Sequence, residues 1–579
     1  MTNLFDYFEG IPSHGQAPSC WAARAPRRPR GDCDVKLTPR VRDWREDADS
    51  LHALAQIEAE PWVAGVTHDG EGVQLRLDDG WIETVGAALE AGGSAEATLS
   101  DLAHGQRISV QFWDANATKA LHAGHLRNLA IGNALAAALA QAGAQVERRS
   151  LISDAGRSMG EAMAGVLHSG RHTPSWPAGG EKSDHFVGVC YADYVATTQS
   201  AGAEAAAAIE HPEDSLTREL TLRDDDADDL LKRVLSGERE ALELWYKTRA
   251  WVISGQRKTL ARLGIAFDRV FFESDFLSEA AELTASGLRS GRLRRREDGV
   301  VFYATGLSDF EEFPLVRADG LPTQHMRALA YWMAAPELEH MTSMQVCGTE
   351  WVSHVTCRRK LMDELMAAGD RTGDTGTGED DNDDRNGKEA GGAEMHPTRD
   401  IFNGMVARQK RAMASSEGAL LIDELTDWLD QQVDANPERL QVRRAHPFPE
   451  RIAAEIVLGY FLPYPVAPRI DFDTDKLLCE DESLGWDLVR ARARHGRTVP
   501  TGGRRPVEDP DYRFAVVQSE LYRRYLRLAV ERFDVRPLAH YLKHLSRWYL
   551  ERERDEHVER VVHTLLDRSA RGLGLEVAR

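Results

Sequence analysis

The sequence predicts an α/β protein whose central domain is built on a parallel sheet, between a small α+β domain and an all-α domain. Three observations predict this fold. A strand, a helix and a second strand follow one another between Ile108 and Ile152, helical sequence fills about 165–275, and 445–579 is helical again. A strand–helix–strand unit of this kind places its two strands side by side and parallel in one sheet.

The composition is that of a globular protein with several domains. The 579 residues carry 71 Lys plus Arg against 93 Asp plus Glu, a formal charge of −22, and a chain of this length usually folds into more than one domain. With 42% hydrophobic and 28% charged residues, it is unlike a disordered chain. The acidic balance argues against indiscriminate binding to nucleic acid but leaves room for a local basic surface.

Neither export nor membrane insertion is expected. No apolar run approaches the roughly 18 residues that a membrane span needs, and the opening MTNLFDYFEG lacks the basic start and apolar core of an export signal. We therefore expect a cytoplasmic monomer without membrane contact. Six scattered cysteines, none in a CxxC motif, indicate reduced thiols and no structural zinc site.

The first residues, 1–44, contain a cluster of arginines among prolines and alanines, and we expect a flexible segment there. Residues 45–105 combine a helical stretch with an alternating one. Because Val73, Leu75 and Leu77 would point to the same side of a strand, this part predicts a small α+β domain.

The strand–helix–strand unit follows directly. Alternation from Ile108 to Phe112 predicts a strand, a helix is expected from near His122 to a cap at Gly143, and 146–152 predicts the second strand. Such a strand–helix–strand unit predicts a parallel sheet with a nucleotide-sized crevice at the carboxyl ends of its strands.

The parallel-sheet domain is expected to span 106–444, with the helical run at about 165–275 inserted in it. Strand-like runs at 300–303 and 344–347 indicate that the same sheet resumes. The stretch at about 369–394 is acidic, rich in glycine and without hydrophobic pattern, so we expect a disordered surface insertion.

The residues best suited to chemistry lie where the first strand gives way to the helix. His122-Ala-Gly-His125 stands at the helix start, where backbone N–H groups attract phosphate and two imidazoles can donate to one group. Gly124 allows close approach to the backbone, and Asn116 and Lys119 lie just upstream. For the bare motif, an incidental polar loop–helix boundary is the alternative.

The surrounding sequence resembles a known family. NATKALHAGHLRNLAIGNAL is similar to the HIGH region of class I aminoacyl-tRNA synthetases, above all arginyl-tRNA synthetase, in which Asn precedes the motif and Leu-Arg follows it. GVQLRLDDGWI is similar to the end of the N-terminal tRNA-contacting domain of that family. SGEREALELWYKTRAWVISGQRKTLARLG resembles its helical insertion, and RIDFDTDKLL and LAHYLKHLSRWYLERERD resemble its anticodon-binding domain. The resemblance covers roughly 60–575.

The resemblance implies a class I, Rossmann-like catalytic domain that activates an amino acid with ATP and Mg²⁺ and transfers it to tRNA. It implies that His122 and His125 stabilise the reacting phosphate, and that Gly348 and Glu350 lie beside the adenosine ribose, although Glu350 could also be a solvated charge at a helix start. The ATP-binding residues implied by the family are Asn116, Gly124, Gly348, Glu350, Met413, Ser415 and Ser416.

The second class I motif, KMSKS, departs from the family pattern. It aligns with Ala-Met-Ala-Ser-Ser at 412–416, so both lysines are missing. Some arginyl-tRNA synthetases lack the second lysine and carry one just before HIGH, where Lys119 stands here. We therefore expect Lys119 to supply the catalytic cation, with Lys410 and Arg411 as alternatives.

The amino-acid pocket departs further. The positions that hold guanidinium-binding groups in the family are Gln111, Gln324 and Ala328 here, and Asp114, close to Asn116, is an unexpected carboxylate. A neutral amide cannot replace the charge partner of a buried guanidinium. We therefore expect an amino acid other than arginine.

Other clusters are weaker candidates. His540 and His544 are spaced i, i+4 but lack the carboxylate of a HExxH site, so we expect exposed helix histidines and no metal. Cys347, His354 and Cys357 have no zinc-type spacing. A local basic face for tRNA is expected from a set of arginines, with a merely solvated surface as the alternative. These are the arginines of 490–497, Arg504, Arg505, Arg523 and Arg524.

The sequence thus predicts an arginyl-tRNA synthetase-like ligase with tRNA and an amino acid as partners, and with altered amino-acid specificity. Two alternatives remain open. One is an adenylating ligase with a non-tRNA acceptor, and the other is a non-catalytic tRNA-binding paralogue.

Overall fold

The structure is a computed structural model, and the statements below concern the residues that it describes. These are 4–8, 21–26, 28–29, 33–40, 43–68, 71–92, 99–170, 181–199, 226–307, 310–334, 341–369, 398–404, 406–408, 411–412, 420–495, 498–499 and 505–575. The acidic stretch expected to be disordered, about 369–394, lies outside them apart from its first residue.

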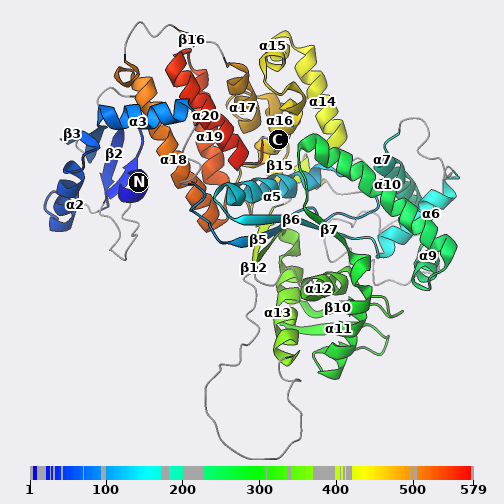
Figure 1. The fold of residues 1–579 in the computed structure, drawn as a ribbon. Helices are drawn as coiled ribbons and strands as arrows, with labels where there is room; N and C mark the ends of the chain where they lie inside the picture. Colours follow the sequence, from blue (N-terminus) through cyan, green and yellow to red (C-terminus); the bar gives the residue numbers. More distant parts are fainter. Residues whose placement is uncertain are drawn as a thin grey trace, which may run out of the picture.

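A five-stranded sheet forms the centre of the molecule (Figure 1). Its strands, all parallel, run in the order β12-β11-β5-β6-β7. Helix α5, Ala123–Gln141, packs on one face so closely that Gly132 leaves no room for a Cβ against the Phe112 ring. The predicted parallel sheet is confirmed. Its strands are β5 (Arg107–Gln111), β6 (Gln145–Ile152), β7 (Arg269–Phe272), β11 (Thr342–Gly348) and β12 (Thr398–Asn403).

The N-terminal part is an antiparallel sheet with the strand order β1-β2-β4-β3 and three helices. Val73, Leu75 and Leu77 are fully buried on one side, as predicted. The expectation of a flexible segment over 1–44 was wrong where the chain is described, because Trp21 and Val35 are buried in this sheet. The elements are α1 (Leu4–Phe8), β1 (Trp21–Arg24), β2 (Val35–Pro39), α2 (Ala48–Glu58), β3 (Val63–His68), β4 (Val73–Leu77) and α3 (Asp79–Glu90).

The described residues between β6 and β7 are mainly helical, as the sequence predicted, and their helices form the group at the right of Figure 1. The longest, α10, ends at Gly264, whose φ of 70° is a left-handed cap that glycine adopts at little cost. The helices are α6 (Arg157–His168), α7 (Ser183–Gln199), α9 (Asp226–Leu235) and α10 (Arg239–Leu263).

A second small sheet lies between β7 and β11, in the lower part of Figure 1. Residues 301–303 belong to this antiparallel sheet, so the run at 300–303 does not resume the central sheet, whereas 344–347 does. Alternation reveals a strand but not its partner. The elements are η1 (Glu273–Phe276), α11 (Leu277–Arg289), β8 (Leu293–Arg295), β9 (Val301–Leu307), β10 (Phe310–Val316), α12 (Gln324–Ala334), η3 (Thr349–Trp351) and α13 (Val352–Gly369).

The remaining chain is helical apart from short strands, and its helices pack along α5 and α3. No helix among the described residues is both long and apolar enough to span a membrane. The helices are α14 (Ile422–Ala435), α15 (Pro437–Ala445), α16 (Ile452–Phe461), α17 (Leu484–Ala493), α18 (Pro510–Arg532), α19 (Arg536–Leu550) and α20 (Glu556–Gly572). The short strands are β13 (Val406–Arg408), β14 (Arg411–Ala412), β15 (Ile470–Asp471), β16 (Thr498–Val499) and β17 (Arg554–Asp555).

Candidate active site

The loop between β5 and α5 lies at the carboxyl ends of the parallel strands and is held there by its neighbour. The Ala117 amide donates to the Ser153 carbonyl at 2.9 Å, and the Ser153 amide donates to the Ala115 carbonyl at 3.1 Å. Asn116, between them, is exposed. The ends of parallel strands are where α/β sheets bind ligands, so this loop is positioned to contact one.

The two histidines of the motif cap helix α5. His122 is the N-cap, and its Nδ1 accepts the Gly124 amide at 3.2 Å, while the Nδ1 of His125 accepts the His122 amide at 3.2 Å. Their ring centroids lie 4.0 Å apart. The capping box satisfies two of the N–H groups that a helix start leaves unpaired and fixes the two rings side by side.

Both imidazoles are neutral near pH 7. Burial lowers the pKa of His122 well below its ordinary value and lowers the pKa of His125 to about 4, and the nearby charge of Lys119 acts in the same direction on each. Because each Nδ1 accepts a backbone N–H, the single proton of each neutral ring belongs on Nε2. Both rings keep some exposed surface. The motif therefore offers two fixed N–H donors.

Lys119 stands beside this pair. The side-chain amide of Gln256 in α10 donates to the Lys119 carbonyl at 2.7 Å and to that of Asn116 at 3.2 Å. The Lys119 ammonium is partly exposed and lies 5.9 Å from the ring centroid of Tyr191. The structure thus brings Lys119 and the two histidines together, as the sequence suggested.

The segment aligned with KMSKS is only partly described. Arg411 and Ala412 form β14, whereas Met413, Ser415, Ser416 and Lys410 lie outside the described residues. Where the chain resumes, it is tied to the histidine motif. The Ala123 amide donates to the Leu420 carbonyl at 2.9 Å, and the Ile422 amide donates to the Leu121 carbonyl at 3.0 Å.

Gly348 and Glu350 lie at the end of β11. The Glu350 carboxylate rests against the Gly348 backbone, where a Cβ would come within 1.9 Å of its Oε1. Any side chain at Gly348 would therefore displace this carboxylate, which explains the glycine.

The residues aligned with the amino-acid pocket form a polar network at the ends of β5 and β11. Both oxygens of Asp114 accept from the Gln111 amide, at 2.9 and 3.0 Å, and Gln345 donates to Asp114 at 2.8 Å. Desolvation by the surrounding protein raises the pKa of Asp114, against these hydrogen bonds, although the residue keeps exposed surface. Gln324 begins α12 and is half-buried, and Ala328 packs with Leu151 and Tyr331.

Two members of this network, and one residue of α5, were not predicted from the sequence. Gln345 is the register partner of Gln111, and the buried Arg358 donates to its Oε1 at 2.8 Å. The buried guanidinium of Arg127 donates to four backbone carbonyls of distant segments. A single sequence does not reveal which strands pair, but the Leu-Arg after the motif was a usable signal for Arg127.

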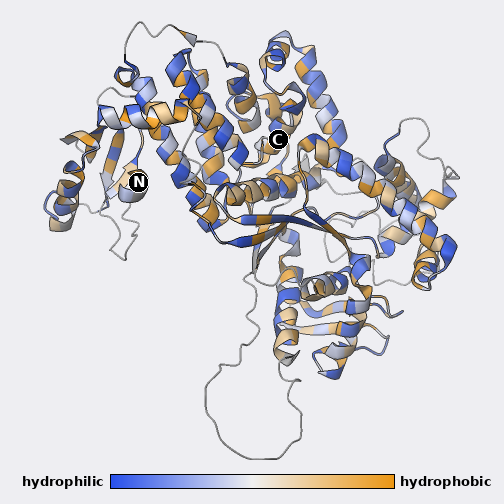
Figure 2. Cartoon of the chain, viewed as in Figure 1, coloured by the Kyte–Doolittle hydropathy of each residue, from blue (hydrophilic) through white to orange (hydrophobic). Residues whose placement is uncertain are grey.

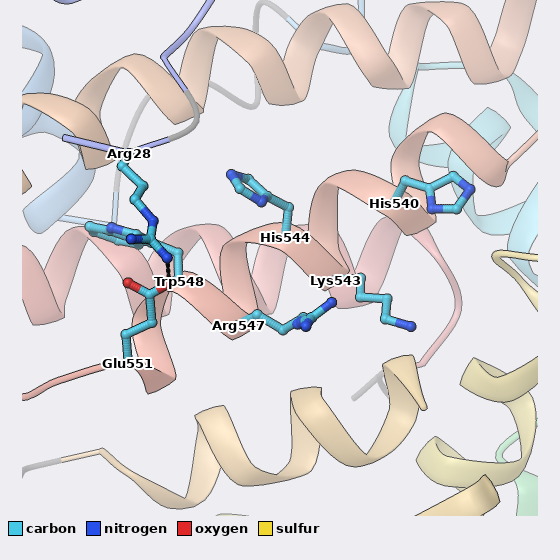
Figure 3. A pocket seen from close by; sticks show the side chains of 7 residues that line it. All are labelled: Arg28, His540, Lys543, His544, Arg547, Trp548 and Glu551. Atoms are coloured by element: carbon cyan, nitrogen blue, oxygen red, sulfur yellow. Dashed lines mark hydrogen bonds and ion pairs between the residues drawn. The ribbon is translucent and has the colours of Figure 1, made fainter. Parts of the chain in front are cut away.

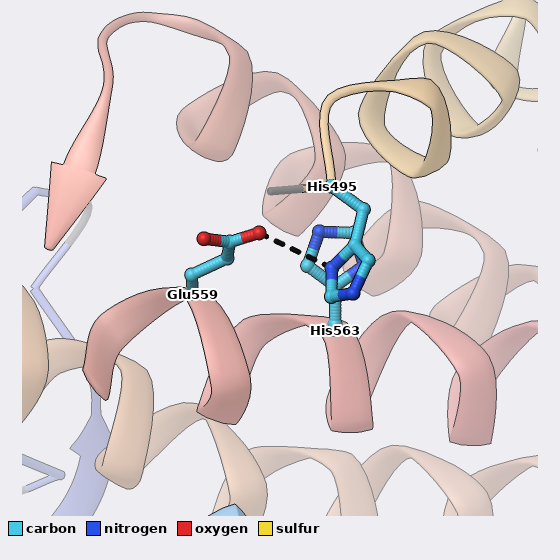
Figure 4. Close-up of side chains that lie close together, drawn as sticks. All are labelled: His495, Glu559 and His563. Atoms are coloured by element: carbon cyan, nitrogen blue, oxygen red, sulfur yellow. Dashed lines mark ion pairs between the residues drawn. The ribbon is translucent and has the colours of Figure 1, made fainter. Parts of the chain in front are cut away.

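Two groups of histidines and carboxylates could hold a metal ion by their spacing. Asp184, His185 and Asp423 form one, but the Lys182 ammonium contacts both of its carboxylates, at 2.8 and 2.7 Å, and already supplies a positive charge. His495, Glu559 and His563 form the other, with an ion pair of 3.1 Å between His495 and Glu559 (Figure 4). Neither group includes a residue of the histidine motif.

His563 makes stability depend on pH. Burial lowers its pKa from 6.5 to about 3, so between these values the unfolded chain binds a proton that the folded chain does not, and stability falls as pH is lowered. At pH 5 this one group should account for about 2 kcal/mol of the loss relative to pH 7.5. Urea unfolding at both pH values should show a smaller difference in His563→Asn than in the parent.

The matched control for that measurement is His544→Asn, which alters an exposed histidine of α19. It should leave the difference between the two pH values unchanged. An equal difference in the parent and in His563→Asn would contradict the assignment.

Several of the arginines predicted to form a basic surface for tRNA form ion pairs with carboxylates. Arg490 and Arg505 are engaged by Glu480 and Glu83, and Arg492 is buried against Glu455. Arg497 and Arg504 lie outside the described residues. A cavity of about 480 Å³ instead opens along α19 (Figure 3). It is lined by Arg28, His540, Lys543, His544, Arg547, Trp548 and Glu551.

A second cavity of about 540 Å³ shares His540 and His544 with the first and adds Arg24 and Arg524. Of the predicted arginines, Arg524 therefore does line this basic surface. Both histidines are exposed, as predicted.

Comparison with known proteins agrees with this geometry. The family model described as tRNA synthetases class I (R), catalytic domain, matches residues 88–174. An arginine–tRNA ligase of Amoebophilus asiaticus is 34% identical over 224 residues, 37% of this chain and 36% of that protein. The arginine–tRNA ligase of Treponema pallidum is 31% identical over 216 residues, 37% of this chain and 33% of that protein. The matches span about a third of the length of these curated relatives.

Solved structures resemble the whole fold. The arginyl-tRNA synthetase of Thermus thermophilus has a TM-score of 0.62 at 18% identity, covering 99% of this chain and 98% of that one. That of Plasmodium falciparum has a TM-score of 0.60 at 12% identity, covering 99% and 97%.

The segment that matches the class I tRNA synthetase catalytic domain contains β5, β6 and the histidine cap of α5, so the site described above lies within the matched part of the chain. Within that class, the whole chain has an arginyl-tRNA synthetase-like fold. The predicted resemblance is confirmed at this level.

Proposed function

We propose that the chain is an ATP-dependent ligase that activates an amino acid as its adenylate and transfers it to tRNA. The observation that carries the proposal is the pair of neutral, mutually capped imidazoles of His122 and His125, with Lys119 beside them, at the start of α5. A helix N-terminus with fixed N–H donors and an ammonium is suited to a triphosphate.

Activation is a displacement at the α-phosphorus of ATP. An oxygen of the amino-acid carboxylate forms the new P–O bond, the bond to the bridging oxygen of the β-phosphate breaks, and pyrophosphate leaves with the electron pair. The Nε2–H groups of His122 and His125 donate to phosphate oxygens as charge builds on them. Lys119 opposes the negative charge of the triphosphate.

Magnesium is expected to arrive with ATP, because it binds phosphate oxygens more readily than an all-protein cage. Near the motif the buried carboxylate of Asp154 is already engaged by Ser274 and Arg249. Because this carboxylate is engaged, we expect the phosphates of the nucleotide to be the main ligands of the metal. Such an ion supplies charge neutralisation for the departing pyrophosphate.

Transfer needs tRNA, whose terminal ribose hydroxyl attacks the acyl carbon and releases AMP. The surface along α19 gathers Arg28, Lys543 and Arg547 and supports a polyanionic partner (Figure 3), although the two arginines also pair with Glu551 and Asp481. Contacts of arginine and lysine with phosphates supply salt-dependent affinity even in an acidic protein. A cytoplasmic location and a monomeric state remain predictions.

The amino acid is proposed to differ from arginine. Of the side chains at the aligned guanidinium-binding positions, Gln111 and Gln324 are amides and Ala328 is apolar. Asp114 is the nearby carboxylate, but it is an exposed residue that accepts from Gln111 and Gln345. A buried guanidinium without a free carboxylate is costly by several kcal/mol.

The test is to incubate the full chain with ATP, Mg²⁺, all twenty amino acids and total tRNA. Mass spectrometry then measures the aminoacyl-adenylate and, after digestion of the tRNA, the terminal aminoacyl-adenosine. We expect tRNA to carry a single amino acid, and that amino acid should not be arginine. Adenylate without charged tRNA would favour a non-tRNA acceptor. Neither product would favour a non-catalytic tRNA-binding protein.

A further inference from the structure

A row of polar side chains crosses the central sheet. Asp400, Gln345, Gln111, Arg149 and Arg269 are consecutive register partners on β12, β11, β5, β6 and β7. Partners in a parallel sheet point to the same face, so the row lies on the face opposite the Phe112 side that α5 covers. Figure 2 shows hydrophilic colouring on these strands. An interior row of this kind must be paired or must bind something.

The row and its immediate partners carry a net positive charge. Arg359 pairs with Asp400, Arg358 donates to Gln345, and Glu147 accepts from Arg149 at 2.5 Å and lies 3.5 Å from Arg269. Asp114 accepts from both glutamines. Four arginines therefore face three carboxylates, which leaves one positive charge. The arginines are Arg149, Arg269, Arg358 and Arg359, and the carboxylates are Asp114, Glu147 and Asp400.

We assign the unbalanced positive charge to the guanidinium of Arg149. Its side chain is 1% exposed, its Nε bonds to Glu147, and its Nη1 and Nη2 have no well-formed hydrogen bond among the described residues. The adjacent Oε1 of Gln111 is also buried without a partner there. The Tyr331 hydroxyl is the neighbouring polar group. The two terminal N–H groups of a guanidinium lie in one plane and form the fork that binds a carboxylate through two parallel hydrogen bonds.

The fork lies at the amino-acid pocket. Gln111, its register partner, and Ala328 hold aligned pocket positions, and Ala328 packs with Tyr331. Burial raises the pKa of Tyr331 to about 12, and the charge of Arg149 and a hydrogen bond from it oppose that rise, which places the two side chains in contact. Phe271 packs against both side chains. The centroid of its ring lies 5.2 Å from the centroid of the Tyr331 ring and 5.6 Å from the guanidinium carbon of Arg149.

We infer that the pocket takes an amino acid with a side-chain carboxylate, aspartate or glutamate, anchored by Arg149. The inference rests on the proposed ligase activity and names its substrate class. A carboxylate would neutralise the row and fill the fork of Arg149. Arginine would instead add a second unbalanced charge, at a buried site where unpaired charge is expensive.

The first test is ATP–pyrophosphate exchange by the full chain with each amino acid alone, in the presence of total tRNA and Mg²⁺. Aspartate or glutamate should support exchange at least about 10²-fold faster than arginine, the ratio that about 3 kcal/mol of charged pairing gives. Exchange with a neutral amino acid or with lysine alone would overturn this inference and leave the proposed function standing. Exchange with arginine alone would overturn this inference and the altered specificity, and would leave the ligase activity standing. Exchange with none would remove both.

The second test is Arg149→Met, which keeps length and apolar volume but removes the fork. The KM for the acidic amino acid should rise about 10²-fold while the KM for ATP stays within about threefold, and Arg149→Lys should fall between. Arg239→Met, which alters an arginine outside the row whose side chain is 89% exposed, is the control and should change neither value. An unchanged amino-acid KM in Arg149→Met would overturn the role of Arg149. If that variant does not fold, Arg149→Lys decides the same point.

Discussion

Replacing His122 with asparagine should lower the rate of amino-acid activation by about 10²–10³-fold without unfolding the protein. Asparagine is a good N-cap, and its side-chain oxygen can accept the Gly124 amide that the imidazole Nδ1 accepts at 3.2 Å. It has no group at the position of Nε2, so only the donor toward the phosphate is lost. Pyrophosphate exchange at saturating ATP measures the effect.

The companion variant His122→Gln tests the same donor from the other side. Its amide nitrogen can occupy the place of Nε2, whereas it caps the helix less well than asparagine. We expect more activity than in His122→Asn and lower thermal stability. Equal activity in the parent and in His122→Asn would show that Nε2 of this residue has no part in the chemistry.

Replacing Arg127 with methionine should cost at least about 3 kcal/mol of folding stability. Its guanidinium, 1% exposed, donates to the carbonyls of Pro465, Val466 and Pro468 at 2.6 to 2.8 Å and also to that of Gly404. Each buried acceptor left unpaired costs about 1–3 kcal/mol. These contacts tie α5 to the chain that follows β12 and to the segment between α16 and α17, so the loss should be cooperative.

Urea unfolding followed by circular dichroism measures this effect. Arg239→Met is the matched control, because its parent side chain is 89% exposed and pairs only at the surface with Glu243. It should change stability by less than about 0.5 kcal/mol. A stable Arg127→Met variant would show that water satisfies those carbonyls.

The sequence was most informative where local pattern and chemistry coincide. The strand–helix–strand unit and the capped His122 and His125 follow from alternation, helix signals and the motif itself. It failed where long-range pairing decides. Residues 301–303 alternate like a core strand but pair in a separate antiparallel sheet, and Trp21, among prolines and arginines, is buried by a strand that only Val35–Pro39 completes.

The same limit applied to the site. The neutrality of the histidines depends on burial that no motif specifies. Gln345 and Arg149 meet Gln111 only because the strands align in one register, and Arg358 reaches Gln345 from α13. Arginine clusters in the sequence were also a poor guide to the basic surface, because Arg490 and Arg505 form ion pairs with carboxylates of other segments.

The most direct test of the central claim is pyrophosphate exchange by the full chain with a mixture of all twenty amino acids, total tRNA and Mg²⁺. If the imidazoles and Lys119 surround the triphosphate of ATP as proposed, label should enter ATP only when amino acids are present, and His122→Asn and His125→Asn should each abolish most of it. A folded parent chain that exchanges no label above an enzyme-free control would contradict the claim.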